Sequence, residues 1–438
     1  MALNGLRVIE FAGLAPGPFA GLILADWGAD VIRIDRVGAS SADTLARHKR
    51  SVALDVKSAA GLALTRRLVA SADVVIDPFR PGVMERMGLG PDVFLGSEQG
   101  HDGLNKRLVF ARLAGFAPKG AHKGMAGHDI NYLALSGVLS MLPGTADKPS
   151  FPLNLLADFG GGGLTCALGI LLALIERSRS GLGQVVSTDM VSGTRYLSTY
   201  PLSSALRPPE NSPPSLFRVP SFPRSLLASS SRPTPRMQHT LDGGAPFYNV
   251  YTCADGRWMS VGCLEPRFYA AFLDRFLAVL PPGYLQERFK GWTPTLARQY
   301  DRDDEWPKLR ELFENGFRMY DRDRWAQVFH GSDACALPVL SPTEAAGLSS
   351  AEESVDGAAP TPHPLLSRTP ALSNDISGPS SSDSNGPSRS PATRSGYLTP
   401  GQHTVEVLQE VLGLCEQEIG ELLAGKVIGV SVGEKSKL

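Results

Sequence analysis

The first 180 residues of the chain alternate short apolar runs with longer stretches of helical pattern. The apolar runs are LRVIEFA (6–12), VIRID (31–35), VVIDPF (74–79) and LVFARL (108–113). Helical stretches, one ending near Trp27 and one over 58–71, lie between them. Strands separated by helices are typical of βαβ units, in which the strands are parallel. We therefore expect an α/β fold whose large domain, 1–200, holds a Rossmann-like parallel sheet.

The turn after the first apolar run indicates whether this sheet binds a dinucleotide. It contains Gly13, Pro16, Gly17 and Pro18 but no G-x-G-x-x-G pattern, so we expect no dinucleotide site.

A net charge of -1 gives no indication of nucleic-acid binding. None of the cysteines forms a C-x-x-C pair, which argues against a zinc site or a disulfide framework and favours a reducing compartment.

Two segments rich in Ser and Pro interrupt the pattern, at 203–240 and 349–399. Such a composition buries too little apolar area to offset the entropy lost on ordering. We interpret 203–240 as a flexible linker and 349–399 as a low-complexity insertion. The residues between them, 241–345, predict a smaller α+β domain.

Within the smaller domain, alternating residues around Asp255-Gly256 predict a β-hairpin. Helical stretches follow near 266–279 and 306–330. Toward the end of the chain, 403–425 has apolar residues at helical spacing. We expect 400–428 to return to the large domain.

Three features bear on location. The longest apolar run, Leu164 to Ile175, is too short to span a bilayer, so we interpret it as a buried helix and expect no membrane span. The N-terminal apolar run contains Glu10 and does not have the layout of a signal peptide. The last residues, Ser436-Lys437-Leu438, match a peroxisomal address that is read by an import receptor. We expect a peroxisomal protein, with the mitochondrion as the alternative compartment.

His128 is the first candidate for proton transfer. It follows Gly127 and precedes the apolar stretch YLALSGVLSML, near the start of a predicted helix. The helix dipole disfavours a cation there, which favours a neutral imidazole that can act as a base. The alternative is an ordinary capping segment with Asp129 in the first turn.

Asp158 is the second candidate, because it precedes four glycines, 160–163, and an apolar helix. At a helix entrance it would lie near free backbone N–H groups, and the glycines would let a ligand approach the backbone. This arrangement suits a developing oxyanion. The alternative is that Asp158 caps the helix and the glycines only permit close packing.

Other charged residues give weaker signals. Glu265 lies between an apolar strand and Pro266, where a helix cap is the simpler interpretation. Arg36 follows a predicted strand, and ligands gather at such positions in open α/β sheets. We interpret most of the basic residues in this half of the chain as a solvated face; the set is Arg33, Arg36, Arg47, Lys49, Arg50, Lys57, Arg80 and Arg86.

Several long stretches resemble the family III CoA-transferase superfamily, in the order of that family. They are LAPGPFAGLILADWGADVIRIDR, RPGVMERMGLGP, AGHDINYLALSGVLS, PLNLLADFGGGG, LDGGAPFYNVYTCADG and LEPRFYAAFL. The resemblance covers about 1–200, 241–345 and, more weakly, 362–425. AGHDINY together with LEPRFY favours the racemases of this superfamily over its transferases.

The resemblance implies roles for particular residues. His128 and Asp158 would be catalytic, and Glu265 would assist the histidine. CoA contacts are implied at Arg36, Leu54, Asp55, Arg86, Gly127, Asp129, Ile130, Asn131 and Tyr132. An interlocked homodimer is also implied, in which Glu265 would serve the partner subunit's His128.

The implied reaction interconverts (2R)- and (2S)-2-methylacyl-CoA thioesters by proton transfer through an enolate. Inversion requires one group on each face, in opposite protonation states. His128 and Asp158 fulfil this if burial raises the pKa of the aspartate. Backbone N–H groups at Gly160 and Gly161 would hold the enolate oxygen, and one such donor is worth about 3 kcal/mol. No metal or redox cofactor is expected, since CoA is part of the substrate.

Some segments depart from the family. FAPKGAHKG (116–124) replaces the glutamine-containing loop usual before the histidine, and 203–240 and 349–399 are also unlike the family. None of these departures removes a proposed catalytic residue. Two alternatives stay open: a family III CoA-transferase that uses Asp158 as nucleophile, and a non-catalytic acyl-CoA-binding protein that keeps the fold.

Overall fold

A computed structural model of the chain describes residues 1–97, 100, 102–145, 147–206, 236–348, 360–372 and 397–431. They divide into two compact units: unit 1 comprises Met1–Gly137, Pro152–Leu197 and Thr361–Leu438, and unit 2 comprises Val138–Phe151 and Ser198–Pro360. Most of the expected linker 203–240, most of the expected insertion 349–399 and the terminal 436–438 lie outside the described residues. Residues 138–151, which we expected in the large domain, group with unit 2.

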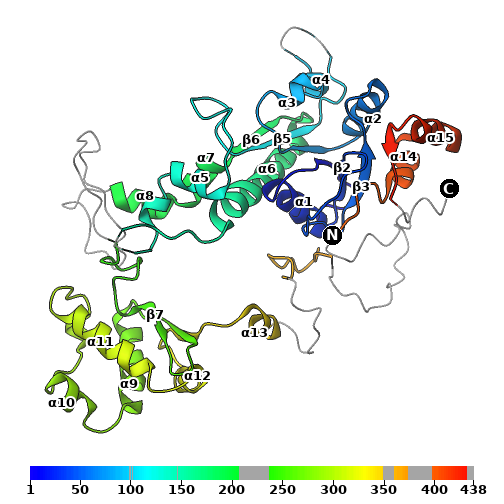
Figure 1. The fold of residues 1–438 in the computed structure, drawn as a ribbon. Coiled ribbons are helices and arrows are strands. Elements are labelled where there is room, and N and C mark those ends of the chain that lie inside the picture. Colours follow the sequence, from blue (N-terminus) through cyan, green and yellow to red (C-terminus); the bar gives the residue numbers. More distant parts are fainter. Residues whose placement is uncertain are drawn as a thin grey trace. The chain divides into compact units, whose positions relative to one another are not determined.

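Unit 1 is built on a seven-stranded sheet in the order β10-β3-β2-β1-β4-β5-β6 (Figure 1). The strands are β1 (Arg7–Phe11), β2 (Asp30–Asp35), β3 (Arg50–Leu54), β4 (Val74–Asp77), β5 (Val109–Ala114), β6 (Val185–Asp189) and β10 (Ile428–Gly429). Neighbouring strands are parallel except β10, which pairs antiparallel with β3. The predicted α/β class with a parallel sheet is confirmed.

Helices cover both faces of this sheet. Along β1, Val8 and Ile9 point to opposite faces, yet each is 1% exposed or less. Val8 packs in a cluster with residues of α1 and α6, whereas Ile9 packs in a cluster with residues of α2, α14 and α15. Continuous burial of this kind explains why the strands are apolar runs without alternation. The helices of unit 1 are α1 (Pro16–Asp26), α2 (Ala59–Ala70), α3 (Val83–Arg86), α4 (Pro91–Leu95), α5 (Asp129–Leu135), α6 (Thr165–Ser180), α7 (Met190–Leu197), α14 (Thr404–Leu412), α15 (Glu416–Ala424) and the π-helix η2 (Leu155–Leu164).

The strand order places a crevice in unit 1. From β1 the chain proceeds to β2 and β3 on one side, and then to β4 and β5 on the other side. The connections after β1 and β4 therefore leave the sheet in opposite directions. In open α/β sheets, ligands bind at the carboxyl ends of the strands at this reversal.

The glycines before α6 lie inside η2 and serve packing. A Cβ at Gly161 would lie 2.5 Å from the backbone nitrogen of Thr194, so only glycine permits this approach of η2 to α7. Gly193 on α7 faces Gly161 equally closely, since its Cβ would lie 1.8 Å from the Gly161 carbonyl oxygen. Two opposed glycines thus set the distance between these helices.

The interpretation of Leu164–Ile175 as a buried helix is wrong for one face. Small residues of α6 pack on the sheet, but Leu164, Leu168, Leu172 and Ile175 are each about half exposed. The helix is apolar on all sides, so its pattern did not distinguish the two faces. By length and composition, the continuous helical stretch Leu155–Ser180 could cross a membrane.

Half of the basic set is not the solvated face that we expected: Arg36, Lys57, Arg80 and Arg86 are exposed, whereas the other four residues are buried or partly buried. Arg33 and Lys49 are 1% exposed or less. Arg33 donates to Asp35, Asp43 and the Leu398 carbonyl oxygen, and so holds the C-terminal segment. Lys49 contacts the carboxylate of Glu10 at 2.7 Å. Leu398 is 365 residues from Arg33, and Glu10 is 39 residues from Lys49, which is why the pattern of charges alone did not indicate burial.

Unit 2 combines a small antiparallel sheet with helices. The sheet has the order β7-β8-β9, from β7 (Tyr248–Thr252), β8 (Trp258–Gly262) and β9 (Ala336–Pro338). The predicted hairpin at Asp255-Gly256 is confirmed, since β7 and β8 pair up to Thr252 and Trp258. The helices are η1 (Leu139–Met141), α8 (Thr199–Leu206), α9 (Pro266–Val279), α10 (Tyr284–Phe289), η4 (Leu296–Arg298), α11 (Glu305–Phe317), α12 (Arg322–Phe329) and α13 (Pro342–Gly347). The stretch 306–330, which predicted one helical region, forms α11 and α12.

Aromatic side chains form the core of unit 2. Phe276 stacks on Trp325 with 5.2 Å between ring centres, which joins α9 to α12. Phe313 meets Phe276 edge-on at 5.2 Å and adds α11 to the same cluster. Each of these rings is fully buried. Edge-to-face and stacked pairs of this kind add stability beyond their buried area.

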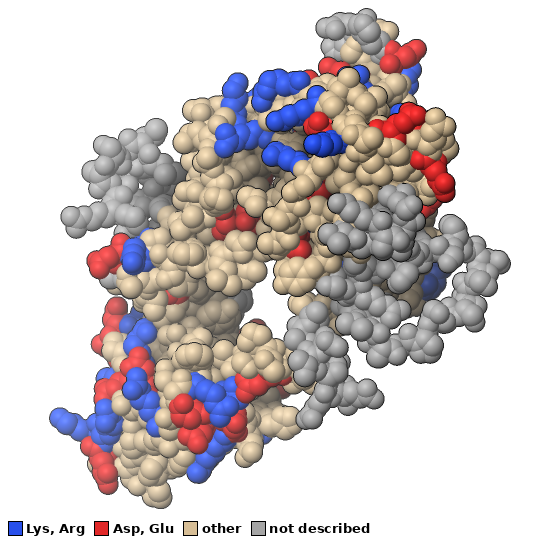
Figure 2. All heavy atoms as spheres, turned by 45° about the vertical axis from the view of Figure 1, so that its right-hand side comes forward, with Lys and Arg blue, Asp and Glu red and all other residues tan. Residues whose placement is uncertain are grey.

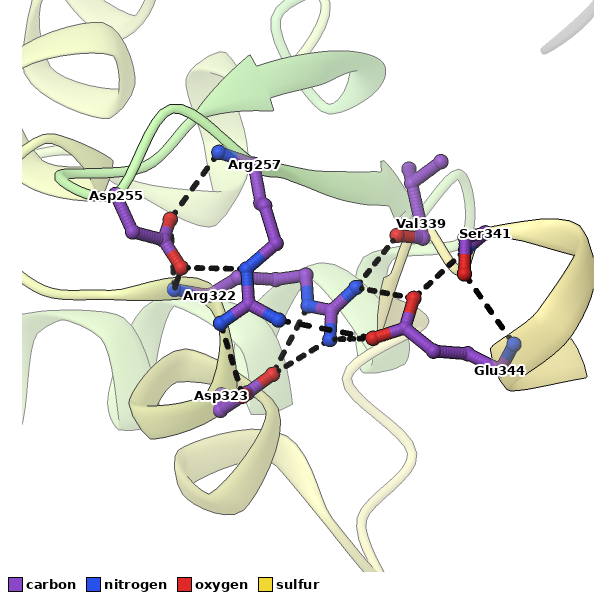
Figure 3. A network of polar contacts seen from close by, with 7 residues as sticks. All are labelled: Asp255, Arg257, Arg322, Asp323, Val339, Ser341 and Glu344. Carbon is purple, nitrogen blue, oxygen red and sulfur yellow. Dashed lines mark hydrogen bonds and ion pairs between the residues drawn. The ribbon is translucent and has the colours of Figure 1, made fainter. Parts of the chain in front are cut away.

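A polar network fastens α13 to α12 (Figure 3). The guanidinium of Arg322 donates to both carboxylate oxygens of Glu344, at 2.6 and 3.0 Å, and to the Val339 carbonyl oxygen. Glu344 also accepts from the backbone N–H of Ser341. Arg322 and these further bonds lower the pKa of Glu344 to about 2. The carboxylate therefore stays ionised across the physiological range.

Candidate active site

A cavity of about 400 Å³ opens in unit 1 at the crevice between the carboxyl ends of β1 and β4. Its walls come from the loops after β1, β4 and β5, together with the start of α5 and parts of η2 and α7. The lining residues are Gly13, Leu14, Pro16, Pro78, Phe79, Arg80, Pro81, Leu113, Ala114, Gly115, Phe116, Lys123, Met125, Ala126, Gly127, His128, Tyr132, Asp158 and Met190. The parallel sheet thus delivers both predicted proton-transfer residues, His128 and Asp158, to one space.

His128 immediately precedes α5 and is exposed toward solvent. Its backbone N–H donates to the side-chain oxygen of Asn131 at 3.1 Å, which caps the helix. Below it, the Tyr132 hydroxyl donates to the Gly127 carbonyl oxygen, and Phe116 meets the Tyr132 ring edge-on at 5.0 Å. The helix cap and these aromatic contacts fix the backbone on both sides of the imidazole.

Asp158 lies in the first turn of η2 and is partly buried. The pKa of its carboxyl group is raised, chiefly because burial disfavours the charged form, and the negative charge of Asp129 acts in the same direction. The side-chain amide of Asn154, 3.3 Å from the Asp158 Oδ2, and the nearby His128 oppose this shift. A raised pKa is what a carboxyl group needs if it is to return a proton at neutral pH.

Asp129 connects the two helices that carry these residues. Its carboxylate is 4% exposed, and Oδ2 accepts from the backbone N–H groups of Ala157 and Asp158, each at 2.8 Å. We expected Asp129 in the first turn of its own helix, as a capping residue or a CoA contact. Its place in the first turn of α5 is confirmed, its carboxylate caps the neighbouring helix η2, and its contact with CoA stays a prediction.

The predicted CoA-contacting residues divide into two groups. Of the run 127–132, Gly127, His128 and Tyr132 line the cavity, while Ile130 and Asn131 are exposed beside it. The second group does not line the cavity; it comprises Arg36, Leu54, Asp55 and Arg86.

The local surroundings of that second group differ from one residue to the next. Leu54 is buried opposite Ile428 in the pairing of β3 with β10, and the Asp55 N–H donates to the Val427 carbonyl oxygen. Arg36 and Arg86 are exposed side chains at the ends of β2 and α3. Their CoA contacts stay a prediction.

Gly160 and Gly161 do not line the cavity. Both lie in the interior of η2 and pack against α7, where a Cβ at Gly160 would meet Leu197 at 2.8 Å. The backbone N–H groups that η2 leaves without partners within the helix belong to its first turn, and two of them are already bonded to Asp129. The structure thus gives Gly160 and Gly161 a packing role. It does not support the prediction that their backbone N–H groups hold the enolate oxygen.

Glu265 belongs to unit 2, where it immediately precedes α9 and makes no capping bond through its side chain. The simpler interpretation of this residue as a helix cap is confirmed for its position, because Glu265 is the N-cap residue of α9 and its carbonyl oxygen accepts from the N–H groups of Phe268 and Tyr269. Its carboxylate is near Tyr300, whose pKa rises to about 12 through burial and, secondarily, through the charge of Glu265. Its assistance to His128 stays a prediction.

Three residues were not assigned to the site from the sequence, although Arg80 was named in the basic set; they are Arg80, Lys123 and Asn154. Arg80 and Lys123 line the cavity, and Arg80 also donates to the Gly124 carbonyl oxygen at 3.3 Å. Figure 2 shows basic side chains gathered around a hollow on unit 1. Arg80 directly follows the predicted strand 74–79, which was a usable signal. Asn154 lies four residues before Asp158, a spacing that brings side chains together on a helix.

The chain is similar to known proteins over almost its whole length. The family model described as CoA-transferase family III matches residues 3–376. The alpha-methylacyl-CoA racemase of Mus musculus is 43% identical over 435 residues, which are 98% of this chain and 98% of the mouse protein. The alpha-methylacyl-CoA racemase of Homo sapiens is 40% identical, again over 98% of each chain.

A solved structure supports the fold. The crystal structure of a CAIB/BAIF family protein from Brucella suis matches with a TM-score of 0.65 and 21% sequence identity, covering 93% of this chain and 99% of the other. At this identity the likeness bears on the fold alone. Together with the match of the family model and the two full-length relatives, it leads to one conclusion: the chain belongs to CoA-transferase family III.

Proposed function

We propose that this protein is an α-methylacyl-CoA racemase, which interconverts the (2R) and (2S) forms of 2-methylacyl-CoA thioesters. The observation that carries the proposal is that His128 and Asp158 line the same cavity, from two different helices. The relatives that share 43% and 40% identity over full length carry the same name.

The chemistry follows from the weak acidity of the α-hydrogen. Removal of this proton places negative charge on the thioester oxygen, so that the intermediate is an enolate. One residue takes the proton from one face and the other returns a proton to the opposite face. The raised pKa of Asp158 lets it hold the returning proton while the neutral imidazole of His128 acts as base. In the reverse direction the two residues exchange roles.

The cavity also suits an acyl-CoA in its charge and polarity. Arg80 and Lys123 supply positive charge for phosphates. Leu14, Met125 and Met190 supply apolar surface for an acyl chain. Positive charge and apolar surface suit a transferase as well as a racemase, so the presence of His128 in the cavity is what favours racemisation.

The first prediction is that the wild-type chain inverts its substrate with uptake of one solvent hydrogen. Incubation of (2R)-2-methylacyl-CoA in D₂O should yield the (2S) thioester with deuterium at C2, measured by NMR and chiral chromatography. Retention of configuration with no deuterium would refute racemisation. An adduct trapped by hydroxylamine at Asp158 during turnover, in the presence of an acceptor acid, would indicate the transferase reaction.

We propose further that the active protein is a homodimer and that Glu265 assists the partner subunit's His128. An exposed apolar stripe at the end of η2 and along α6, formed by Leu164, Leu168, Leu172 and Ile175, supports an interface, since contiguous apolar patches mark interaction sites. In a symmetric dimer, one surface is used twice, and a residue from each subunit can complete the other site.

The second prediction tests this arrangement by complementation. His128→Ala and Glu265→Ala chains should each be inactive, whereas a mixture refolded together should regain about one quarter of wild-type activity. Half of the dimers would be mixed, and one of the two sites in each would be intact. If Glu265 serves its own chain, or if the protein sediments as a monomer, no activity returns and this proposal is refuted.

Import into peroxisomes is proposed from the terminal Ser436-Lys437-Leu438 alone. The import receptor would be the partner of these residues. A chain lacking Leu438 should stay in the cytosol when expressed with a fluorescent N-terminal fusion, and unchanged import of that chain would refute the proposal.

A further inference from the structure

We propose that Asp129 is a positioning residue that holds the backbone of Asp158 at a fixed place relative to His128. This inference rests on the proposed racemase reaction, because it concerns the geometry between its two proton-transfer residues. The resemblance to the family assigns Asp129 only to the run of CoA contacts. Asp129 is 4% exposed, and its Oδ2 is bonded within the protein.

The first argument is geometric. Asp129 is the residue after His128 and the first residue of α5. Its Oδ2 accepts from the N–H groups of Ala157 and Asp158, both at 2.8 Å. A single buried oxygen therefore joins the peptide unit of one proton-transfer residue to the backbone next to the other. A shift of α5 against η2 would have to break both bonds.

The first turn of η2 lacks acceptors for its backbone N–H groups within its own helix. In a π-helix the N–H groups of the first turn have no acceptor within the helix. Here they lie at the cavity wall, where an unsatisfied buried donor would be costly. Asp129 supplies the acceptor from outside the helix, and its negative charge suits the positive end of the helix dipole. No side-chain cap of η2 comes from its own preceding residue, Asn154.

The third argument is that the remaining bonding of Asp158 is weak. Its carboxylate has one hydrogen bond from a described side chain, that of Asn154 at 3.3 Å. The placement of the carboxylate therefore depends on its backbone, and the backbone depends on Asp129. Misplacement of a reacting group by about 1 Å can cost 10²-fold in rate. The role of Asp129 should thus be visible in kcat.

The experiment compares Asp129→Ala and Asp129→Asn in the full-length protein. Alanine removes the acceptor, whereas the side-chain oxygen of asparagine can accept the same two N–H groups. A matched control is Asn105→Ala. The Asn105 side chain also bridges backbone segments, with bonds to the Ala70 and Ala72 carbonyl oxygens at 3.1 and 2.8 Å, but at the amino ends of the strands.

The first readout does not require activity. Amide hydrogen exchange of the 155–160 segment should accelerate about 10-fold or more in Asp129→Ala, stay near wild type in Asp129→Asn, and be unchanged in Asn105→Ala. Unchanged protection in Asp129→Ala would overturn the inference even if the protein proved not to be a racemase.

The second readout is kinetic. Asp129→Ala should lower kcat by about 10- to 100-fold with little change in KM, and Asp129→Asn should restore most of this loss. Deuterium uptake at C2 should fall unequally from the (2R) and (2S) thioesters, because only one face depends on Asp158. A rise in KM alone, or an equal loss on both faces that matches Asn105→Ala, would overturn the inference.

Discussion

Replacement of His128 or Asp158 by alanine is expected to lower the rate of racemisation by about 10²- to 10⁴-fold or more, the range attributed to a positioned acid or base. Each residue serves one face of the substrate, so neither can replace the other. Asp158→Asn should be as inactive as Asp158→Ala, because the amide keeps the shape but transfers no proton. The measurement is the initial rate of inversion from each enantiomer.

Two controls separate chemistry from folding in this prediction. His330→Ala and Asp92→Ala remove an exposed histidine and an exposed aspartate that do not line the cavity. Both should retain wild-type rates. All of these variants should unfold within a few degrees of the wild type. A His128→Ala protein that is folded and retains more than about one tenth of the rate would contradict the assignment.

Replacement of Lys49 by alanine is expected to produce the largest loss of stability, about 3 to 5 kcal/mol. Lys49 and Glu10 are completely buried and lie 2.7 Å apart. The ammonium also donates to the Pro18 carbonyl oxygen at 2.8 Å. Without Lys49, the carboxylate of Glu10 would be an unpaired charge in the core. Gly21 leaves room for this carboxylate, since a Cβ there would lie 1.7 Å from Glu10 Oε2.

The loss should depend on pH in a definite direction. Burial raises the pKa of Glu10 above the ordinary value of a glutamate side chain. The folded state then binds a proton more readily than the unfolded state, so this group contributes stability at low pH that is lost as the pH rises through the folded-state pKa. In Lys49→Ala, burial raises the pKa of Glu10 without the lowering effect of the lysine charge. The loss of stability of Lys49→Ala relative to wild type should therefore be smaller near pH 5 than near pH 8.

A double variant tests the cause of this loss. Glu10→Leu combined with Lys49→Met removes both charges with similar volume and should recover much of the stability, because buried ion pairs are replaced by apolar residues at little cost. Hydrogen exchange of β1 and β3 peptides under increasing urea reports on unit 1 alone. A double variant as unstable as Lys49→Ala, or a deficit independent of pH, would contradict the explanation.

The strands that could be predicted from the sequence are those that form continuous apolar runs. Strands β1, β2, β4 and β5 are apolar runs covered on both faces, and each lies where a run was predicted. Strand β6, VVSTD, escaped prediction because its first residues are exposed and polar ones follow. Strand β3, RSVAL, escaped because Arg50 and Ser51 leave an apolar run of only three residues.

Contacts between distant residues could not be predicted from local pattern. Glu10 and Lys49 are 39 residues apart, and no local sequence pattern near either residue indicates that they pair. Likewise, Asp129 bonds to backbone groups 28 and 29 residues away, so its position after His128 suggested only a cap of its own helix. For the glycines 160–163 the sequence left a ligand contact and close packing open, and the structure shows close packing of Gly160 and Gly161 against α7.

His128 and Asp158 were predicted because each has a local signal that points to a helix entrance. That they share a cavity depends on the sheet, whose reversal between β1 and β4 brings separate loops to one crevice. Arg80 and Lys123 complete the same wall. Their role required the three-dimensional arrangement, because basic residues are common on solvated surfaces.

The central claim is that His128 and Asp158 act on opposite faces of one carbon atom. The most direct measurement is deuterium uptake at C2 in D₂O, from (2R) and (2S) thioesters separately, by His128→Ala and Asp158→Ala. The account predicts complementary behaviour: each variant exchanges one enantiomer without inverting it, and the two variants exchange opposite enantiomers. Exchange of the same enantiomer by both variants, or inversion by either one, would contradict it.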